Sequence, residues 1–291
     1  MLTKLQQIFP NLVLDSQIPT SKYNEYEWYQ NDDLEVLGIP REEITEKEVH
    51  LLSTFLTPYH HFFPEVTEQE KKWESRIQMN TEEKIVHPFR FVFFSIQQKQ
   101  IDPKTFKEAI NELFHKEVSI LWENDYEGII IEEKTTIDED ISYEQIIDIL
   151  ISDLYVNLKV FVGPYQYDLN NIKHHYENIL HSAKVAFQFT DKIVLSYIDA
   201  IPLLIMDKLG TSFKEELKNS ILKHYKNDSE FLQTIEIFIE SNLNISVAAK
   251  KMYMHRNSLQ YRLDKFQEHT GIDIRDFQQA MTVYFALIAN K

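Results

Sequence analysis

Five polar or basic residues near the C-terminus have the side-chain types that read base edges in double-stranded DNA. They are Arg256, Asn257, Ser258, Gln260 and Tyr261. Arginine, asparagine and glutamine can each form paired hydrogen bonds with a base in the major groove. Lysine and arginine neutralise phosphate, and four such residues in the same stretch are Lys250, Lys251, Arg262 and Lys265. We interpret the first five as base contacts and the other four as phosphate contacts.

Presenting these side chains together requires two short helices joined by a tight turn. Ser246 is expected to cap the first helix, because its hydroxyl can accept a hydrogen bond from a backbone N–H one turn on. Ala248, Ala249 and Met252 would form the inner face, and the two alanines matter because helices that cross closely need small side chains at the crossing. Tyr253 stands in the turn, where many helix-turn-helix proteins place glycine, so we expect a turn without a positive φ.

The second helix, roughly residues 256–268, should bury Leu259, Leu263 and Phe266, which recur at helical spacing. The polar and basic residues then lie on the outer face, as in the recognition helix of a helix-turn-helix. An inward tilt of this helix would instead make Arg262 a structural residue.

The charge distribution separates this segment from the rest of the chain. Residues 245–265 contain five basic residues and one acidic residue, a net charge of +4. The whole chain carries −16, so the remainder carries −20. A local positive surface on an acidic protein suits phosphate binding, because the acidic surfaces elsewhere are repelled by DNA. The alternative interpretation is an ordinary helical pair with a solvated basic face.

Two runs in this region resemble a known family. His255 to Leu263 reads HRNSLQYRL, and Thr270 to Asp276 reads TGIDIRD. They are similar to the C-terminal helix-turn-helix of PucR/CdaR-type bacterial transcriptional regulators, whose pattern is close to HRNTLxYRL with a later TGxDL. The resemblance covers about the last 60 residues, and Ser258 stands where threonine is usual, which keeps the hydroxyl.

The resemblance implies a sequence-specific regulator that binds an operator in double-stranded DNA. The family's named inducers are sugar acids and purine metabolites. No residue in 1–200 indicates that this chain binds either, so a small-molecule effector stays unidentified.

Between residues 87 and 197 the pattern changes to alternating strands and helices. The expected strands lie at residues 89–96, 118–123, 128–132, 158–162 and 192–197. With the intervening helices the order is β-α-β-β-α-β-α-β, and its first six elements are those of a ferredoxin-like sheet. In PucR/CdaR-type regulators a domain related to GGDEF cyclases holds this position. The segment 160–164, followed by Tyr176, Ala183 and Ala186, resembles that domain's strand-Gly-helix segment.

This middle region lacks the acidic residues with which a GGDEF cyclase binds two cations. Residues 95–99, where the first strand ends, contain no acid, and the hairpin at 124–128 reads NDYEG. No Gly-rich phosphate loop or nucleophile elbow is present either. We therefore predict no enzymatic activity, no cofactor and no metal. A cation bound by His174, Glu177 and His181 is the weaker alternative to a solvated stripe on one helix.

These patterns predict an α+β protein in four parts. The parts are residues 1–84, an N-terminal α+β region of unknown role; 85–200, a GGDEF-like, ferredoxin-like regulatory or dimerisation domain; 201–228, a helical linker; and 229–291, a PucR-type helix-turn-helix domain. In the first part we expect strands at 26–29 and 34–39 and a capped helix after Thr45. In the last part, a helix at 276–289 should bury Phe277, Met281, Phe285 and Ile288.

The chain has no cysteine, and its longest apolar run, at 200–206, has seven residues, so we expect a cytoplasmic protein that does not span a membrane. A homodimer is expected, because a two-fold operator presents half-sites about 34 Å apart. Two other functions remain open. One is a helix-turn-helix adaptor or dimerisation protein without DNA binding, which the net charge of −16 favours. The other is a degenerate cyclase-like protein that senses a nucleotide.

Overall fold

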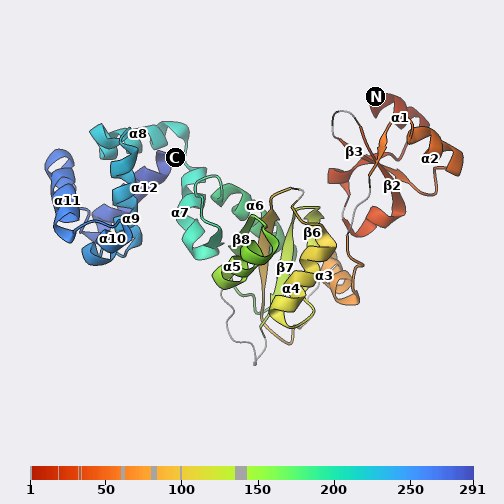
Figure 1. Ribbon diagram of the computed structural model, residues 1–291, viewed down its shortest axis with the longest axis horizontal. Helices are drawn as coiled ribbons and strands as arrows, with labels where there is room; N and C mark the ends of the chain where they lie inside the picture. The colour runs from red at the N-terminus through yellow and green to blue at the C-terminus, as the bar shows by residue number, and fades with distance from the viewer. Residues whose placement is uncertain are drawn as a thin grey trace. The chain divides into compact units, whose positions relative to one another are not determined.

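The computed structural model describes residues 2–18, 20–31, 33, 35–59, 63–79, 84–98, 100–134 and 143–291. The chain divides into two compact units (Figure 1). One comprises Met1–Ala183 with Lys192–Tyr197, and the other comprises Lys184–Asp191 with Ile198–Lys291. The first unit contains two sheets and the second is helical, so the predicted α+β class is confirmed. The four-part division of the sequence stays a prediction.

A small antiparallel sheet lies at the start of the first unit. Its strands, in the spatial order β1-β3-β2-β4, are β1 (Val13–Leu14), β3 (Val36–Pro40), β2 (Tyr26–Gln30) and β4 (Thr57–Pro58). The helical segments around it are α1 (Leu2–Ile8), the short 3-10 helices η1 (Asp15–Gln17) and η2 (Thr20–Glu25), and α2 (Glu46–Leu52). Thr45 and Glu48 form the capping box that begins α2, as predicted. Leu34, which was expected to begin the second strand, lies outside the described residues.

A second, five-stranded sheet follows the helix α3 (Glu68–Met79). Its strands, in the spatial order β6-β7-β5-β8-β9, are β6 (Ser119–Asn124), β7 (Glu127–Glu133), β5 (Phe89–Ile96), β8 (Leu158–Val162) and β9 (Val194–Ser196). Its helices are α4 (Pro103–Phe114), α5 (Tyr143–Leu154) and α6 (Ile172–Ala186). The predicted order of elements is observed, and the first four strands have the ferredoxin-like arrangement. The relationship to GGDEF domains stays a prediction.

Strand β5 is the middle strand of the large sheet, and both of its faces are covered. Its side chains alternate between the two faces. Val92, Phe94 and Ile96 share a buried cluster with residues of α4 and α5. On the other face, Phe89 lies 4.8 Å from the Trp73 ring of α3, and Phe91 lies 5.5 Å from the Tyr176 ring of α6, between centroids. The sheet is therefore covered on both faces, which explains the nearly continuous apolar run of the strand.

The second unit is built of helices. They are α7 (Tyr197–Lys208), which begins at the last residue of the first unit, α8 (Thr211–Leu222), the short 3-10 helix η3 (Lys223–Tyr225), α9 (Ser229–Glu240), α10 (Ile245–Lys251), α11 (Arg256–Thr270) and α12 (Phe277–Ala289). Ile235 and Phe238 of α9, Phe266 of α11 and Val283 of α12 belong to one buried cluster. None of the helices in the described part of the chain is both long and apolar enough to cross a membrane.

The predicted inner face of α12 is partly wrong. Ile288 is buried, but Phe277 is 71% exposed and Met281 is 46% exposed. Val283 and Ala286 are buried instead. The helix has no charged residue, so its sequence does not mark a single polar side. The neighbouring helices decide which of its apolar residues are covered.

Candidate nucleic-acid interface

Helix α10 begins one residue before Ser246. The Asn244 side-chain oxygen accepts hydrogen bonds from the backbone N–H groups of Ser246 and Val247, at 3.0 and 3.1 Å. Asn244 is therefore the N-cap, and the prediction that Ser246 caps this helix is wrong. Ala248 and Ala249 are buried, so the predicted inner face of small residues is confirmed.

The turn after α10 contains a left-handed residue. The Met254 N–H donates to the Ala249 carbonyl at 3.0 Å, and the Tyr253 N–H donates to the Lys250 carbonyl at 3.2 Å. This pair of bonds defines a Schellman motif, whose residue after the cap needs a positive φ. Tyr253 occupies that position with φ 52°. The prediction of a turn without positive φ is wrong, because the hydrogen-bond pattern requires this geometry whatever the residue type.

Helix α11 has one buried side and one exposed side, as predicted. The His255 Nδ1 accepts a hydrogen bond from the Asn257 N–H at 3.2 Å and caps the helix. Leu259, Leu263 and Phe266 are buried. The five predicted base-contact residues, Arg256, Asn257, Ser258, Gln260 and Tyr261, are all exposed on the first two turns. Their role in reading bases stays a prediction.

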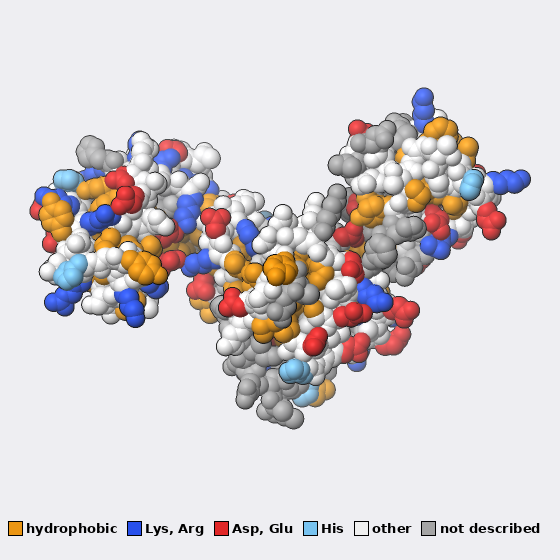
Figure 2. Space-filling view, viewed as in Figure 1, with side chains coloured by type: hydrophobic (Ala, Val, Ile, Leu, Met, Phe, Trp, Pro, Cys, Tyr) orange, Lys and Arg blue, Asp and Glu red, His pale blue; other side chains and the backbone are white. Residues whose placement is uncertain are grey.

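The four predicted phosphate contacts lie in two environments. Lys250 and Lys251 are exposed in the last turn of α10. The Lys265 ammonium lies 2.6 Å from the Glu268 carboxylate and 5.7 Å from the centroid of the Tyr261 ring. The hydrogen bond to Glu268 raises the pKa of Lys265, so the side chain stays charged. Figure 2 shows Lys and Arg side chains, in blue, at the surface of the second unit.

Arg262 differs from the three lysines because its guanidinium is bonded to α9. Its Nη1 donates to the Thr234 hydroxyl at 3.1 Å, and its Nη2 donates to a Glu230 carboxylate oxygen at 3.0 Å. The Arg262 side chain is only 34% exposed. This geometry supports the structural alternative for Arg262, in which the guanidinium ties the recognition helix to α9.

The C-terminal end of α11 is held by a residue that the sequence analysis did not single out. The Arg275 guanidinium lies 2.7 Å from both Asp264 and Asp273, and it donates to the Gln267 amide oxygen at 2.5 Å. The bond from Arg275 lowers the pKa of Asp273. Gly271 ends the helix with φ 78°. The TGIDIRD run therefore holds the C-terminal end of α11, and its position beside that helix end was the available signal in the sequence.

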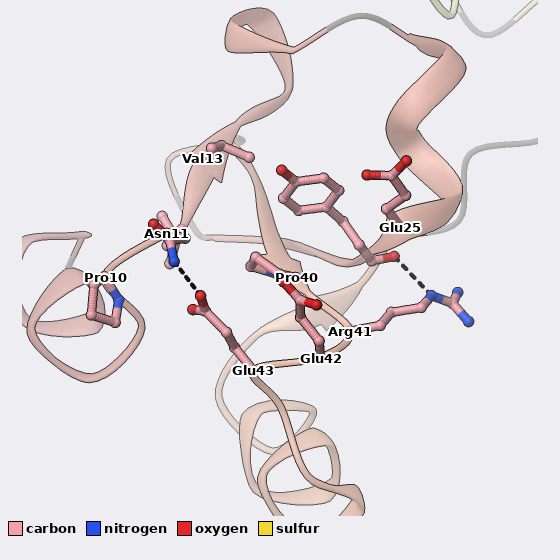
Figure 3. A pocket seen from close by; sticks show the side chains of 10 residues that line it. Pro10, Asn11, Val13, Glu25, Pro40, Arg41, Glu42 and Glu43 are labelled. Atoms are coloured by element: carbon pink, nitrogen blue, oxygen red, sulfur yellow. Dashed lines mark hydrogen bonds between the residues drawn. The ribbon is translucent and has the colours of Figure 1, made fainter.

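An open hollow of about 700 Å³ lies in the small sheet of the first unit (Figure 3). Its lining includes Tyr26, Arg41 and Glu43. The Arg41 Nε donates to the Tyr26 carbonyl at 3.2 Å, and Glu43 accepts a hydrogen bond from the amide of Asn11. The second carboxylate oxygen of Glu43 is buried and has no hydrogen-bond partner among the described residues. One unpaired oxygen does not define a ligand, so the geometry assigns none to the hollow.

The predicted alternative of a cation on α6 gains no support. Within the residues that the structure describes, no group of three or more His, Asp or Glu side chains could hold a metal ion. Glu177 of the proposed trio lies 4.0 Å from the ammonium of Lys173 on the same helix.

Comparison with known proteins finds a matching domain family and several similar proteins. Residues 231–289 match the PucR C-terminal helix-turn-helix domain. The chain is 31% identical over 278 residues to the protein YxkF of Bacillus subtilis (strain 168), covering 91% of each chain. It is 30% identical over 89 residues to the purine catabolism regulatory protein of B. subtilis (strain 168), covering 31% of this chain and 17% of that protein.

The chain is also similar to a further regulator and to one solved structure. The chain is 29% identical over 89 residues to the carbohydrate diacid regulator of Escherichia coli (strain K12), covering 30% of this chain and 23% of that protein. A crystal structure of a regulator of polyketide synthase expression from Bifidobacterium adolescentis is 15% identical, with a TM-score of 0.35, covering 77% of this chain and 94% of that chain. The relatives with described functions are regulators and not enzymes. The chain belongs to the PucR/CdaR-type family of transcriptional regulators.

Proposed function

We propose that this regulator binds DNA sequence-specifically by placing α11 in the major groove. One observation carries the proposal: five side chains suited to base edges lie exposed at the start of a helix whose opposite side is buried. In helix-turn-helix proteins the N-terminal residues of the second helix contact the bases. The proposed base contacts are Arg256, Asn257, Ser258, Gln260 and Tyr261.

We propose the lysines of α10 and α11 as the phosphate contacts. Lys250 and Lys251 lie in the first helix of the motif, which crosses the DNA backbone in such complexes. Lys265 lies about one turn beyond Tyr261, the last of the proposed base contacts. Arg262 is proposed as an anchor instead, because both of its terminal nitrogens already donate to α9, one to Glu230 and one to Thr234.

The charge distribution supports an approach to DNA through α10 and α11. The segment 245–265 carries +4 and the remainder of the chain carries −20. DNA is repelled by the acidic remainder and attracted to this segment. The protein therefore approaches DNA with α10 and α11 facing the duplex.

A homodimer on a two-fold operator completes the proposal. One helix-turn-helix contacts few bases, whereas two copies whose recognition helices lie about 34 Å apart read two half-sites. The dimer thereby gains the affinity that separates a specific site from the excess of non-specific DNA.

Selection of genomic fragments by the purified protein tests this function. We expect a recurrent inverted repeat, bound with an affinity that falls steeply with salt in anisotropy titrations. Asn257→Ala should weaken binding by about 1–3 kcal/mol, because one paired contact to a base is lost. Gln278→Ala, an exposed amide in α12, is the matched control and should bind as the wild type.

Equal binding to every fragment, or an Asn257→Ala variant that binds as tightly as the wild type, would contradict sequence-specific reading by α11. Failure to bind any DNA would favour the adaptor function, for which the net charge of −16 is the supporting observation.

A further inference from the structure

Tyr253 combines an unfavourable backbone conformation with a fully exposed side chain. It occupies the left-handed position of the Schellman motif at the end of α10, with φ 52°. Glycine is usual there because it has no Cβ to clash with the backbone. The Tyr253 side chain is 99% exposed, so packing within the protein does not compensate for this conformation.

The position of Tyr253 places it where a helix-turn-helix meets the DNA backbone. It lies between Lys251, the last residue of α10, and Arg256, the first residue of α11. When the start of the second helix enters the major groove, the first helix crosses the sugar-phosphate backbone. The turn between them is then held beside the phosphates that flank the groove.

We propose that the Tyr253 hydroxyl donates a hydrogen bond to a backbone phosphate oxygen and thereby sets how α11 enters the groove. This inference rests on the proposed DNA-binding function. Tyrosine hydroxyls are established donors to DNA phosphates, and contacts of this kind fix the register and orientation of a protein on the duplex. The Tyr253 side chain is fully exposed at the turn, and Lys250 and Lys251, which precede it in the chain, supply positive charge.

Tyr155 provides an internal comparison. It also has a left-handed backbone, with φ 54°, and its side chain is 83% exposed at the end of α5 in the first unit. The chain has only five glycines. A general scarcity of glycine is therefore the competing explanation for a tyrosine at either position. The two explanations predict different DNA affinities for matched variants of Tyr253 and Tyr155.

Four variants of the full chain test the proposal, with the recovered genomic fragment as the probe. Tyr253→Gly and Tyr155→Gly should each raise the Tm, because glycine adopts the left-handed conformation without a clash. Only Tyr253→Gly should lose DNA affinity. Tyr253→Phe keeps the ring and the backbone conformation, so it should weaken binding by about tenfold through loss of a bond to a charged acceptor. Tyr155→Phe should bind as the wild type.

The salt dependence gives a second measurement. A neutral hydroxyl displaces no counterion, so Tyr253→Phe should lower the affinity without changing the slope of log K against log salt. Wild-type affinity in Tyr253→Phe overturns the proposed hydrogen bond, whatever Tyr253→Gly does. If the wild type selects no DNA, the proposed function fails and this inference fails with it. If the wild type binds and both Tyr253 variants match it, the inference alone fails.

Discussion

At the scale of single residues, Arg256 and Arg262 show how neighbours decide the role of a side chain. Both lie on α11, and both have a guanidinium suited to phosphate or to a base. Arg256 is exposed at the first turn. Arg262, six residues later, is bonded to Glu230 and Thr234 of α9. We therefore expect replacement of Arg256 by alanine to affect DNA binding, and replacement of Arg262 by alanine to affect stability.

Arg262→Ala should lower the Tm of the second unit modestly and leave the salt slope of DNA binding unchanged. The ion pair is partly exposed, so its own contribution is below about 1 kcal/mol. Lys251→Ala, by contrast, should reduce the magnitude of the salt slope by about two, because the dimer loses one phosphate contact in each subunit. Circular dichroism melting and anisotropy titration measure the two effects. A salt slope whose magnitude drops by about two in Arg262→Ala would return this residue to the phosphate contacts.

At the scale of elements, α3 protects the edge strand of the large sheet. The Glu70 carboxylate accepts hydrogen bonds from the Lys107 ammonium and from the backbone N–H of Ile120 in β6, both at 2.8 Å. Glu70 and Lys107 are buried. One carboxylate therefore joins α3, α4 and β6, and it satisfies a donor that an edge strand would otherwise leave unpaired.

Glu70→Ala should destabilise the first unit by about 3–5 kcal/mol, because it leaves the buried Lys107 ammonium without a partner. All three tryptophans, Trp28, Trp73 and Trp122, lie in this unit, so their fluorescence during urea unfolding reports on it selectively. The double variant Glu70→Leu with Lys107→Met should recover much of the loss, since both charges are removed. A loss below about 1 kcal/mol in Glu70→Ala would show that water or another group compensates the lysine.

At the scale of the whole molecule, the salt dependence of operator binding reports the number of subunits on the DNA. Three lysines per subunit are proposed to contact phosphate. Each phosphate contact contributes about −0.9 to the slope of log K against log salt, so we expect about −5 for a dimer and about −3 for a monomer. Sedimentation of the complex measures its mass independently. A monomeric complex with the smaller slope would contradict the proposed dimer.

The sequence alone determined the features that depend on local periodicity. The range of β5 and the buried residues Leu259, Leu263 and Phe266 followed from the spacing of apolar side chains, which is repeated within each element. The HRNSLQYRL and TGIDIRD runs could also identify the family from the sequence, because each motif is a contiguous stretch of the chain. The exposed set on α11 followed once its buried side was known.

Only the tertiary structure decided which partners distant residues meet. Arg262 bonds to Glu230, which is 32 positions away, and Glu70 accepts from an N–H that is 50 positions away. The exposure of Phe277 depended on which side of the uncharged helix α12 its neighbours cover. Periodicity within a segment carries no information on such pairings, because they arise only when separate elements pack together. The left-handed backbone of Tyr253 is the one local feature that the sequence did not predict. Its residue type argued against a positive φ, but the two Schellman hydrogen bonds of the turn require one.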